Sequence, residues 1–153
     1  MIKVIFSFLL LFSLTQKAVA VYDVNENCKT AWMLVMDLKL DQARKLLASE
    51  IKSNPENYYA YYLDHTCDLF GLLINSSDAK YDAFVKNFDK KRDIMDGKDE
   101  NSPYYLSCYS EMELQVAVLS IMRGAQWSGL KKGYSAYKKL YRNLDKFPEF
   151  KPN

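Results

Sequence analysis

Apolar residues recur at intervals of three and four along most of the chain, which is the pattern of helices that bury one face. No stretch shows the sustained alternation expected of a half-buried strand. The pattern predicts an all-α domain of about six antiparallel helices, arranged as three stacked hairpins after an N-terminal signal helix. The expected helices cover, to within a few residues, 25–38, 41–53, 55–73, 78–97, 103–122 and 126–147.

Proline and capping residues set the expected ends of these helices. Asn54-Pro55 and Ser102-Pro103 each place a capping side chain before a proline that fits the first turn of a helix. Asp41 suits the cap of the second helix. The prolines at positions 55, 103 and 148 fall at the ends of the three predicted pairs, so the positions of these prolines agree with three hairpins.

A short pattern occurs twice, near the two ends of the chain. In each copy a small residue is followed by aliphatic residues four and eight positions later, and by a proline twelve positions later. The copies are Ala43, Leu47, Ile51 and Pro55, and Ala136, Leu140, Leu144 and Pro148. A small residue with aliphatic residues one and two turns later describes a helix packed closely against a neighbour, and its recurrence indicates stacked helical hairpins.

These positions resemble the small, large and proline positions of a tetratricopeptide hairpin, with Ala31 and Gly124 in the matching register. Glu50 and Asn143 stand where the motif usually has a small residue, and the middle pair lacks the alanine. The spacing of the pairs also exceeds the ~34 residues of a regular repeat. The resemblance therefore implies an irregular, tetratricopeptide-like domain that works by offering surface.

The mature chain also resembles a group of uncharacterised secreted bacterial proteins with N-terminal helical hairpins. The tracts that carry this likeness cover residues 36–47, 101–105 and 147–150. The resemblance implies an exported location and a fold, without an activity. In such relatives the helical region looks like the front part of a longer protein, so a module linked to a downstream domain is an alternative interpretation of this chain.

The first twenty residues have the features of a secretory signal peptide. Lys3 provides the positive charge, residues 4–14 are apolar apart from serine, and Ala18-Val19-Ala20 matches the cleavage pattern. The apolar run is shorter than the ~20 residues that span a bilayer, so we expect no membrane span after cleavage. The sequence thus predicts a signal peptide over 1–20, a helical-hairpin domain over 21–153, and a periplasmic or extracellular protein.

Charge argues against a nucleic-acid partner. Because two of the 21 basic residues, Lys3 and Lys17, fall in the signal peptide, the mature chain would carry 19 basic and 19 acidic residues. A protein that binds a polyanion normally has a basic excess. Six of the basic residues that remain lie along the last helix, where they indicate either a solvated face or a docking strip for an acidic partner or anionic membrane. They are Lys131, Lys132, Lys138, Lys139, Arg142 and Lys146.

The three cysteines, Cys28, Cys67 and Cys108, would enter an oxidising compartment. Their spacing matches no zinc pattern, and their odd number leaves at least one unpaired. The sequence is compatible with buried free thiols and with a single disulfide.

Twelve tyrosines, grouped after Pro55, after Pro103 and along the last helix, suit either packing between helices or a binding groove. The functional hypothesis is an exported scaffold, without chemistry or cofactor of its own, that binds a protein or peptide through the first helix of each pair. The predicted contact residues are Tyr58, Tyr62, His65, Tyr105, Tyr109 and Glu113.

One cluster invites chemistry, at Asp64-His65-Thr66-Cys67-Asp68. A metal site or a hydrolytic centre at His65, Cys67 and Asp68 is the alternative hypothesis. On a helix, however, His65 and Cys67 point in different directions, and the chain has no second histidine. Ordinary packing and surface polarity explain these residues better.

Overall fold

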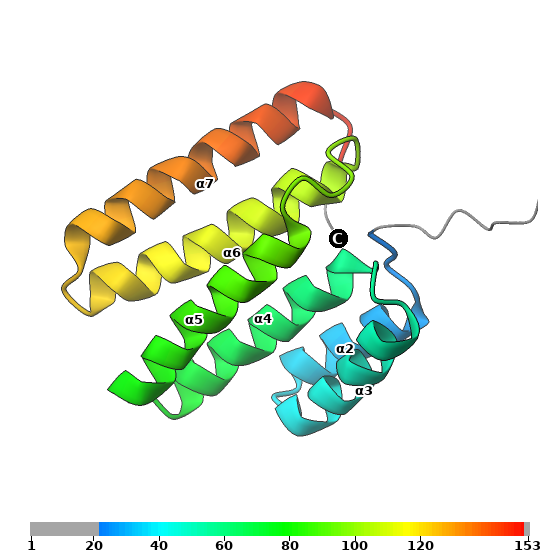
Figure 1. Cartoon of the computed structure of the whole chain (residues 1–153), viewed down its shortest axis with the longest axis horizontal. Helices are drawn as coiled ribbons and strands as arrows, with labels where there is room; N and C mark the ends of the chain where they lie inside the picture. The colour runs from blue at the N-terminus through cyan, green and yellow to red at the C-terminus, as the bar shows by residue number, and fades with distance from the viewer. Residues whose placement is uncertain (1–21, 152–153) are drawn as a thin grey trace, which may run out of the picture.

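The computed structural model describes residues 22–151, so the predicted signal peptide over residues 1–20 lies outside the described residues. The described chain forms six helices and no strand, which confirms the all-α prediction (Figure 1). The helices are α2 (Glu26–Met36), α3 (Leu40–Ser53), α4 (Tyr58–Ile74), α5 (Asp78–Met95), α6 (Pro103–Met122) and α7 (Gln126–Lys146).

Three of the helices begin at a side chain that accepts a hydrogen bond from the first turn. Asn25 caps α2, Ser77 caps α5 and Ser102 caps α6. Pro103 occupies the first turn of α6, as the sequence predicted. Local capping chemistry therefore explains why the predicted and observed bounds of these helices agree.

The starts of α3 and α4 differ from the prediction. α3 begins at Leu40, so Asp41 lies in its first turn and does not cap it. α4 begins at Tyr58, and residues 54–57 form a turn instead of its first turn. In this turn Asn57 is fully buried and donates hydrogen bonds to the Asp23 carbonyl and to Glu50. The turn thus ties α3 and α4 to the segment before α2.

Each helix packs against the next one in the chain, and alternate helices also meet. α4 lies against α2 as well as α3, and α6 lies against α4 as well as α5. α7 packs along α6 at one edge of the molecule, and the α2–α3 pair lies at the other end (Figure 1). Thus α4 fills the corner between α2 and α3, and α6 fills the corner between α4 and α5.

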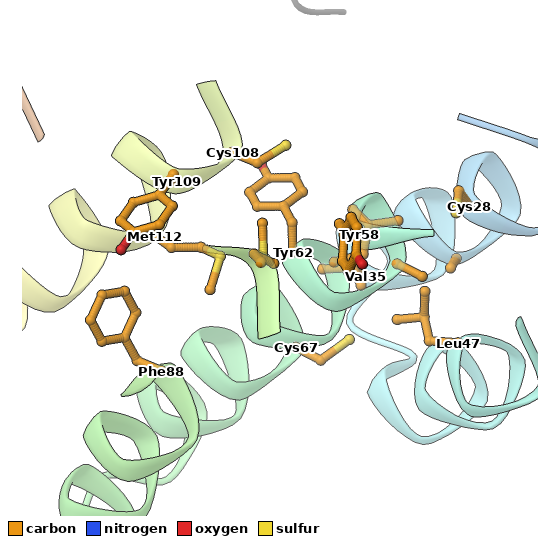
Figure 2. Close-up of a cluster of buried hydrophobic side chains, with 14 of the residues drawn as sticks. Cys28, Val35, Leu47, Tyr58, Tyr62, Cys67, Phe88, Cys108, Tyr109 and Met112 are labelled. Atoms are coloured by element: carbon orange, nitrogen blue, oxygen red, sulfur yellow. The ribbon is translucent and has the colours of Figure 1, made fainter. Parts of the chain in front are cut away.

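The buried side chains form one core that runs from α2 and α3 through α4 to α6 (Figure 2). Cys28, Cys67 and Cys108 lie in it as free, buried thiols, as one of the two sequence predictions had it. Tyr59 and Tyr104 meet edge to face, with 5.7 Å between ring centroids. These two tyrosines, which follow Pro55 and Pro103, therefore pack between α4 and α6, one of the two roles that the sequence left open for the tyrosines.

Glu50 is a buried carboxylate, only 3% exposed, at a position where the repeat motif usually has a small residue. It accepts hydrogen bonds from the side-chain amides of Asn25 and Asn27 at 2.7 Å, and of Asn57 at 3.0 Å. Burial alone would raise its pKa, but these hydrogen bonds outweigh burial and hold the pKa below its usual value. Glu50 thus connects α2, α3 and the turn before α4 through its hydrogen bonds.

Candidate functional site

All six predicted contact residues lie in the interior of the structure. Their exposed fractions are 6% for Tyr58, 5% for Tyr62, 0% for His65, 7% for Tyr105, 9% for Tyr109 and 8% for Glu113. The structure therefore does not bring them together as one exposed cluster. In this arrangement little of their surface is open to a partner, although Tyr62 also lines a pocket between α4 and α6.

The polar atoms of these residues join one helix to another. The Tyr62 hydroxyl of α4 donates to Glu111 of α6 at 2.8 Å. Glu113 of α6 pairs with Lys139 of α7 at 2.8 Å. The Tyr105 hydroxyl accepts from the backbone N–H of Gly97 at 3.1 Å, which fastens the end of α5 to α6. Their observed contacts are those of packing residues.

The candidate chemical cluster on α4 is divided between two environments. The Asp64 and Asp68 carboxylates pair with Lys91 of α5 at 2.6 and 2.7 Å, and Arg44 of α3 pairs with Asp68 at 2.8 Å. Burial alone would raise the pKa of Asp68, but the positive charges of Lys91 and Arg44 lower it by a larger amount. The pKa therefore lies below its usual value. The two acids therefore serve an ion-pair network that joins α3, α4 and α5.

His65 and Cys67 stand apart from that network and from each other. His65 stacks on Phe84 of α5 with 4.7 Å between ring centroids, and Cys67 is a buried thiol with a pKa raised to about 11 by burial. Within residues 22–151, no group of three or more His, Cys, Asp or Glu side chains is placed to hold a metal ion. The geometry does not assemble the alternative site.

His65 should make stability depend on pH. Burial, with Lys91 nearby, lowers its pKa to about 3 in the folded protein, against about 6.5 in the unfolded chain. Below about pH 6.5 the unfolded chain therefore binds a proton that the folded protein refuses, so stability falls as pH falls from 6.5 towards 3. We expect a loss of about 2 kcal/mol between pH 7 and pH 5 from this residue.

Urea unfolding of the wild type and a His65→Leu variant at pH 7 and pH 5 measures this contribution. The variant should lose less stability over that range. Because His65 is the only histidine in the chain, the imidazole NMR signals report its protonation directly, and they should not titrate between pH 8 and pH 5. A titration midpoint near 6.5 in the folded protein would contradict the prediction.

A run of exposed apolar side chains lies along α7, the helix at the edge of the molecule (Figure 1). Six large side chains, spaced alternately three and four residues apart, are between 52 and 79% exposed. They are Trp127, Leu130, Tyr134, Tyr137, Tyr141 and Leu144, and we name them the α7 stripe. Such spacing places all six on one side of a helix, in the way that a helix presents residues to a partner.

The side of α7 next to the stripe carries the small residues that approach α6. A Cβ atom added to Gly129 would lie 2.7 Å from the carbonyl oxygen of Ala117, and Ala136 is buried. Beside this contact an open groove of about 410 Å³ runs between the two helices. It is lined by Ser107, Ser110, Glu111, Leu114, Gly133, Ala136, Tyr137 and Leu140, and we name it the α6–α7 groove.

The lysines of α7 divide between these two sides. Lys139 pairs with Glu113, and the Lys132 ammonium lies 4.9 Å from the centre of the Phe88 ring, so both take part in packing. Lys131, Lys138 and Arg142 are exposed. Each follows a residue of the α7 stripe by one position, which places these three cations along one edge of the stripe.

Comparisons with protein-family models, with curated proteins and with solved structures found no match. None of the helices in the described part of the chain is both long and apolar enough to pass through a bilayer.

Proposed function

We propose that this protein is an exported, tetratricopeptide-like scaffold that binds another protein, and that its binding site is the α6–α7 groove with the α7 stripe. The protein performs no chemistry of its own in this proposal. The observation that carries it is the α7 stripe, because a contiguous exposed apolar surface of this kind marks an interaction site.

The position of the groove indicates what shape of ligand it takes. The corner between α2 and α3 holds α4, and the corner between α4 and α5 holds α6. At the position in α7 that matches Leu47 of α3 in the repeated pattern, Leu140 is 45% exposed, whereas Leu47 is fully buried. A helix laid in the α6–α7 groove would cover Leu140, Tyr137 and Leu114.

The charges on α7 indicate what kind of helix would bind there. The exposed cations Lys131, Lys138 and Arg142 follow the edge of the α7 stripe, and Asp145 is the only acidic residue of α7. A second copy of α7 laid against the stripe would bring like charges together, which disfavours self-association. The complementary occupant is an amphipathic helix of another protein, with acidic residues along the edge that lies over these cations and away from Glu111 of the groove.

Binding of a synthetic helix tests this function. We expect an 18-residue amphipathic peptide with a leucine stripe and glutamates along one edge to bind with a micromolar Kd, measured by fluorescence anisotropy. The same peptide with lysines in place of the glutamates should bind at least about tenfold more weakly. The double variant Tyr137→Glu, Leu140→Glu should lose binding by a similar factor, since both side chains lie in the groove.

Ile94→Glu is the matched control, because Ile94 is an exposed apolar residue of α5 outside the groove. It should leave peptide binding unchanged. Equal binding of the two peptides, or wild-type affinity of the double variant, would contradict the proposal. A dimer that Tyr137→Glu dissociates in sedimentation would show that a second copy covers the stripe, and would likewise overturn it.

A further inference from the structure

A second concave feature lies on the first helices of the three pairs, away from the α7 stripe. It is a pocket of about 280 Å³ lined by Val24, Trp32, Tyr59, Tyr62, Tyr104, Ser107, Cys108 and Glu111. These residues come from α2, α4 and α6 and from the segment before α2. Its volume is near the small end of the range for ligand sites, about 300–1,000 Å³, so it suits one small group.

Half of the residues that line this pocket are aromatic. Tyr59 packs against Tyr62 at 5.5 Å and against Tyr104 at 5.7 Å between ring centroids. Trp32 of α2 supplies a further aromatic surface. Figure 2 shows the Tyr62 side chain of α4 reaching towards Cys108 of α6, and both residues line the pocket. Aromatic faces carry partial negative charge, and they attract a cation placed over them.

Glu111 adds a full negative charge at the same place. Its carboxylate accepts a hydrogen bond from the Tyr62 hydroxyl at 2.8 Å and, among the described residues, pairs with no lysine or arginine. No basic side chain lines the pocket. Burial raises the pKa of Tyr62 well above its usual value, and the Glu111 charge raises it further, so the phenol stays a neutral donor. The electrostatics of the pocket therefore favour a positive ligand.

We propose that this pocket binds a quaternary ammonium group, held by the aromatic faces of Trp32, Tyr59 and Tyr104 and by the Glu111 carboxylate. A primary ammonium carries three N–H donors and is strongly hydrated, and besides Glu111 the side chains of the pocket walls offer it only neutral hydroxyl oxygens, so its desolvation there is poorly offset. A quaternary ammonium has no donor to satisfy. Its charge is balanced by one carboxylate, and its methyl groups fit against aromatic rings.

NMR titration of the folded protein tests this site with small probes. We expect choline and tetramethylammonium to shift the indole N–H signal of Trp32 and to leave that of Trp127 in place, since Trp127 lies outside the pocket. A Trp127→Phe variant assigns the two signals. The neutral analogue 3,3-dimethylbutan-1-ol should bind at least about tenfold more weakly than choline, because it has the shape without the charge.

Two further ligands distinguish a free small molecule from a methylated side chain of a protein. N-acetyl-trimethyllysine amide should bind at least as tightly as choline if the group arrives on a peptide, and more weakly if it arrives on a free small molecule. Unmethylated N-acetyl-lysine amide should bind at least about tenfold more weakly than the trimethylated form. Either order of the two quaternary ligands supports the site.

Glu111→Gln should reduce choline affinity about tenfold while the protein stays folded, because the amide still accepts the Tyr62 hydrogen bond. The matched control is Glu56→Gln, an exposed glutamate that does not line the pocket, and it should bind choline as the wild type does. Choline affinity equal to that of the neutral analogue, or unaffected by Glu111→Gln, would overturn the proposal. Ser107 and Glu111 also line the α6–α7 groove, so the comparison of choline with its neutral analogue, which changes no residue, is the test that separates this site from helix binding there.

Discussion

Gly129→Ala should destabilise the protein by about 2 kcal/mol and loosen α7 from α6. The added Cβ would lie 2.5 Å from Cγ1 of Ile121 and 2.7 Å from the carbonyl oxygen of Ala117. The Ile121 side chain can turn away, but Ala117 presents backbone, so the α7 helix itself has to move. Urea unfolding followed by circular dichroism measures the loss, and amide hydrogen exchange should show it concentrated in α7.

Gly133→Ala provides a matched control one turn along the same helix. There the added Cβ would meet only the Cβ of Ala117 at 3.8 Å, which is ordinary contact. Because alanine favours a helix interior over glycine by roughly 0.5–1 kcal/mol, this variant should be as stable as the wild type or slightly more stable. A Gly129→Ala variant that unfolds at the same urea concentration as Gly133→Ala would contradict the close approach of α6 and α7.

The six helices were predictable because local chemistry sets them. The signals that predicted them each act over only a few residues of the chain. They are the apolar residues at intervals of three and four, the Ser102-Pro103 start of α6, and the scarcity of glycine and proline. The start of α4 was missed for a non-local reason. Asn57 is held in the turn by Asp23, which is 34 residues away in the sequence, and by Glu50 of the preceding helix, and so it does not lie within α4.

The positions of the tyrosines were harder to predict because α4 and α6 are apolar on more than one side. Periodicity then does not say which side faces solvent. The predicted contact residues Tyr58 and Tyr105 are buried, whereas their neighbours Tyr59 and Tyr104 line the aromatic pocket. One position along a helix is a rotation of 100°, so an error of one residue exchanges a core side chain for a pocket side chain.

The α7 stripe was visible in the sequence as a helical pattern, but its meaning depends on which side of α7 packs. An apolar stripe ordinarily faces the core. In α7 the side that faces α6 carries Gly129, Gly133 and Ala136, which allow close approach, and the large side chains remain outside. The spacing of these small residues was the signal in the sequence that could have identified the exposed side.

Lys91→Met should destabilise the protein by about 3–4 kcal/mol, the largest loss we expect from a single side chain. The Lys91 ammonium bonds to Asp64 at 2.6 Å and to Asp68 at 2.7 Å, and the side chains of Lys91 and Asp68 are about nine-tenths buried. Methionine keeps most of the packing volume but leaves two carboxylates facing each other, with Arg44 as the remaining cation. Urea unfolding at pH 7 measures the loss.

Lys90→Met separates this charge effect from the effect of methionine on helix α5, because Lys90 is the preceding residue and is exposed. It should change stability by no more than about 0.5 kcal/mol.

The pH dependence gives a second readout. In the wild type, Asp68 has a pKa below its usual value, so its contribution is present above about pH 4 and is lost as pH falls through the lowered pKa. Without Lys91 the Asp68 carboxyl is protonated more readily, so the gap between Lys91→Met and the wild type should narrow as pH falls below 4. A constant gap over that range would show that Lys91 stabilises the protein by packing and not by its charge.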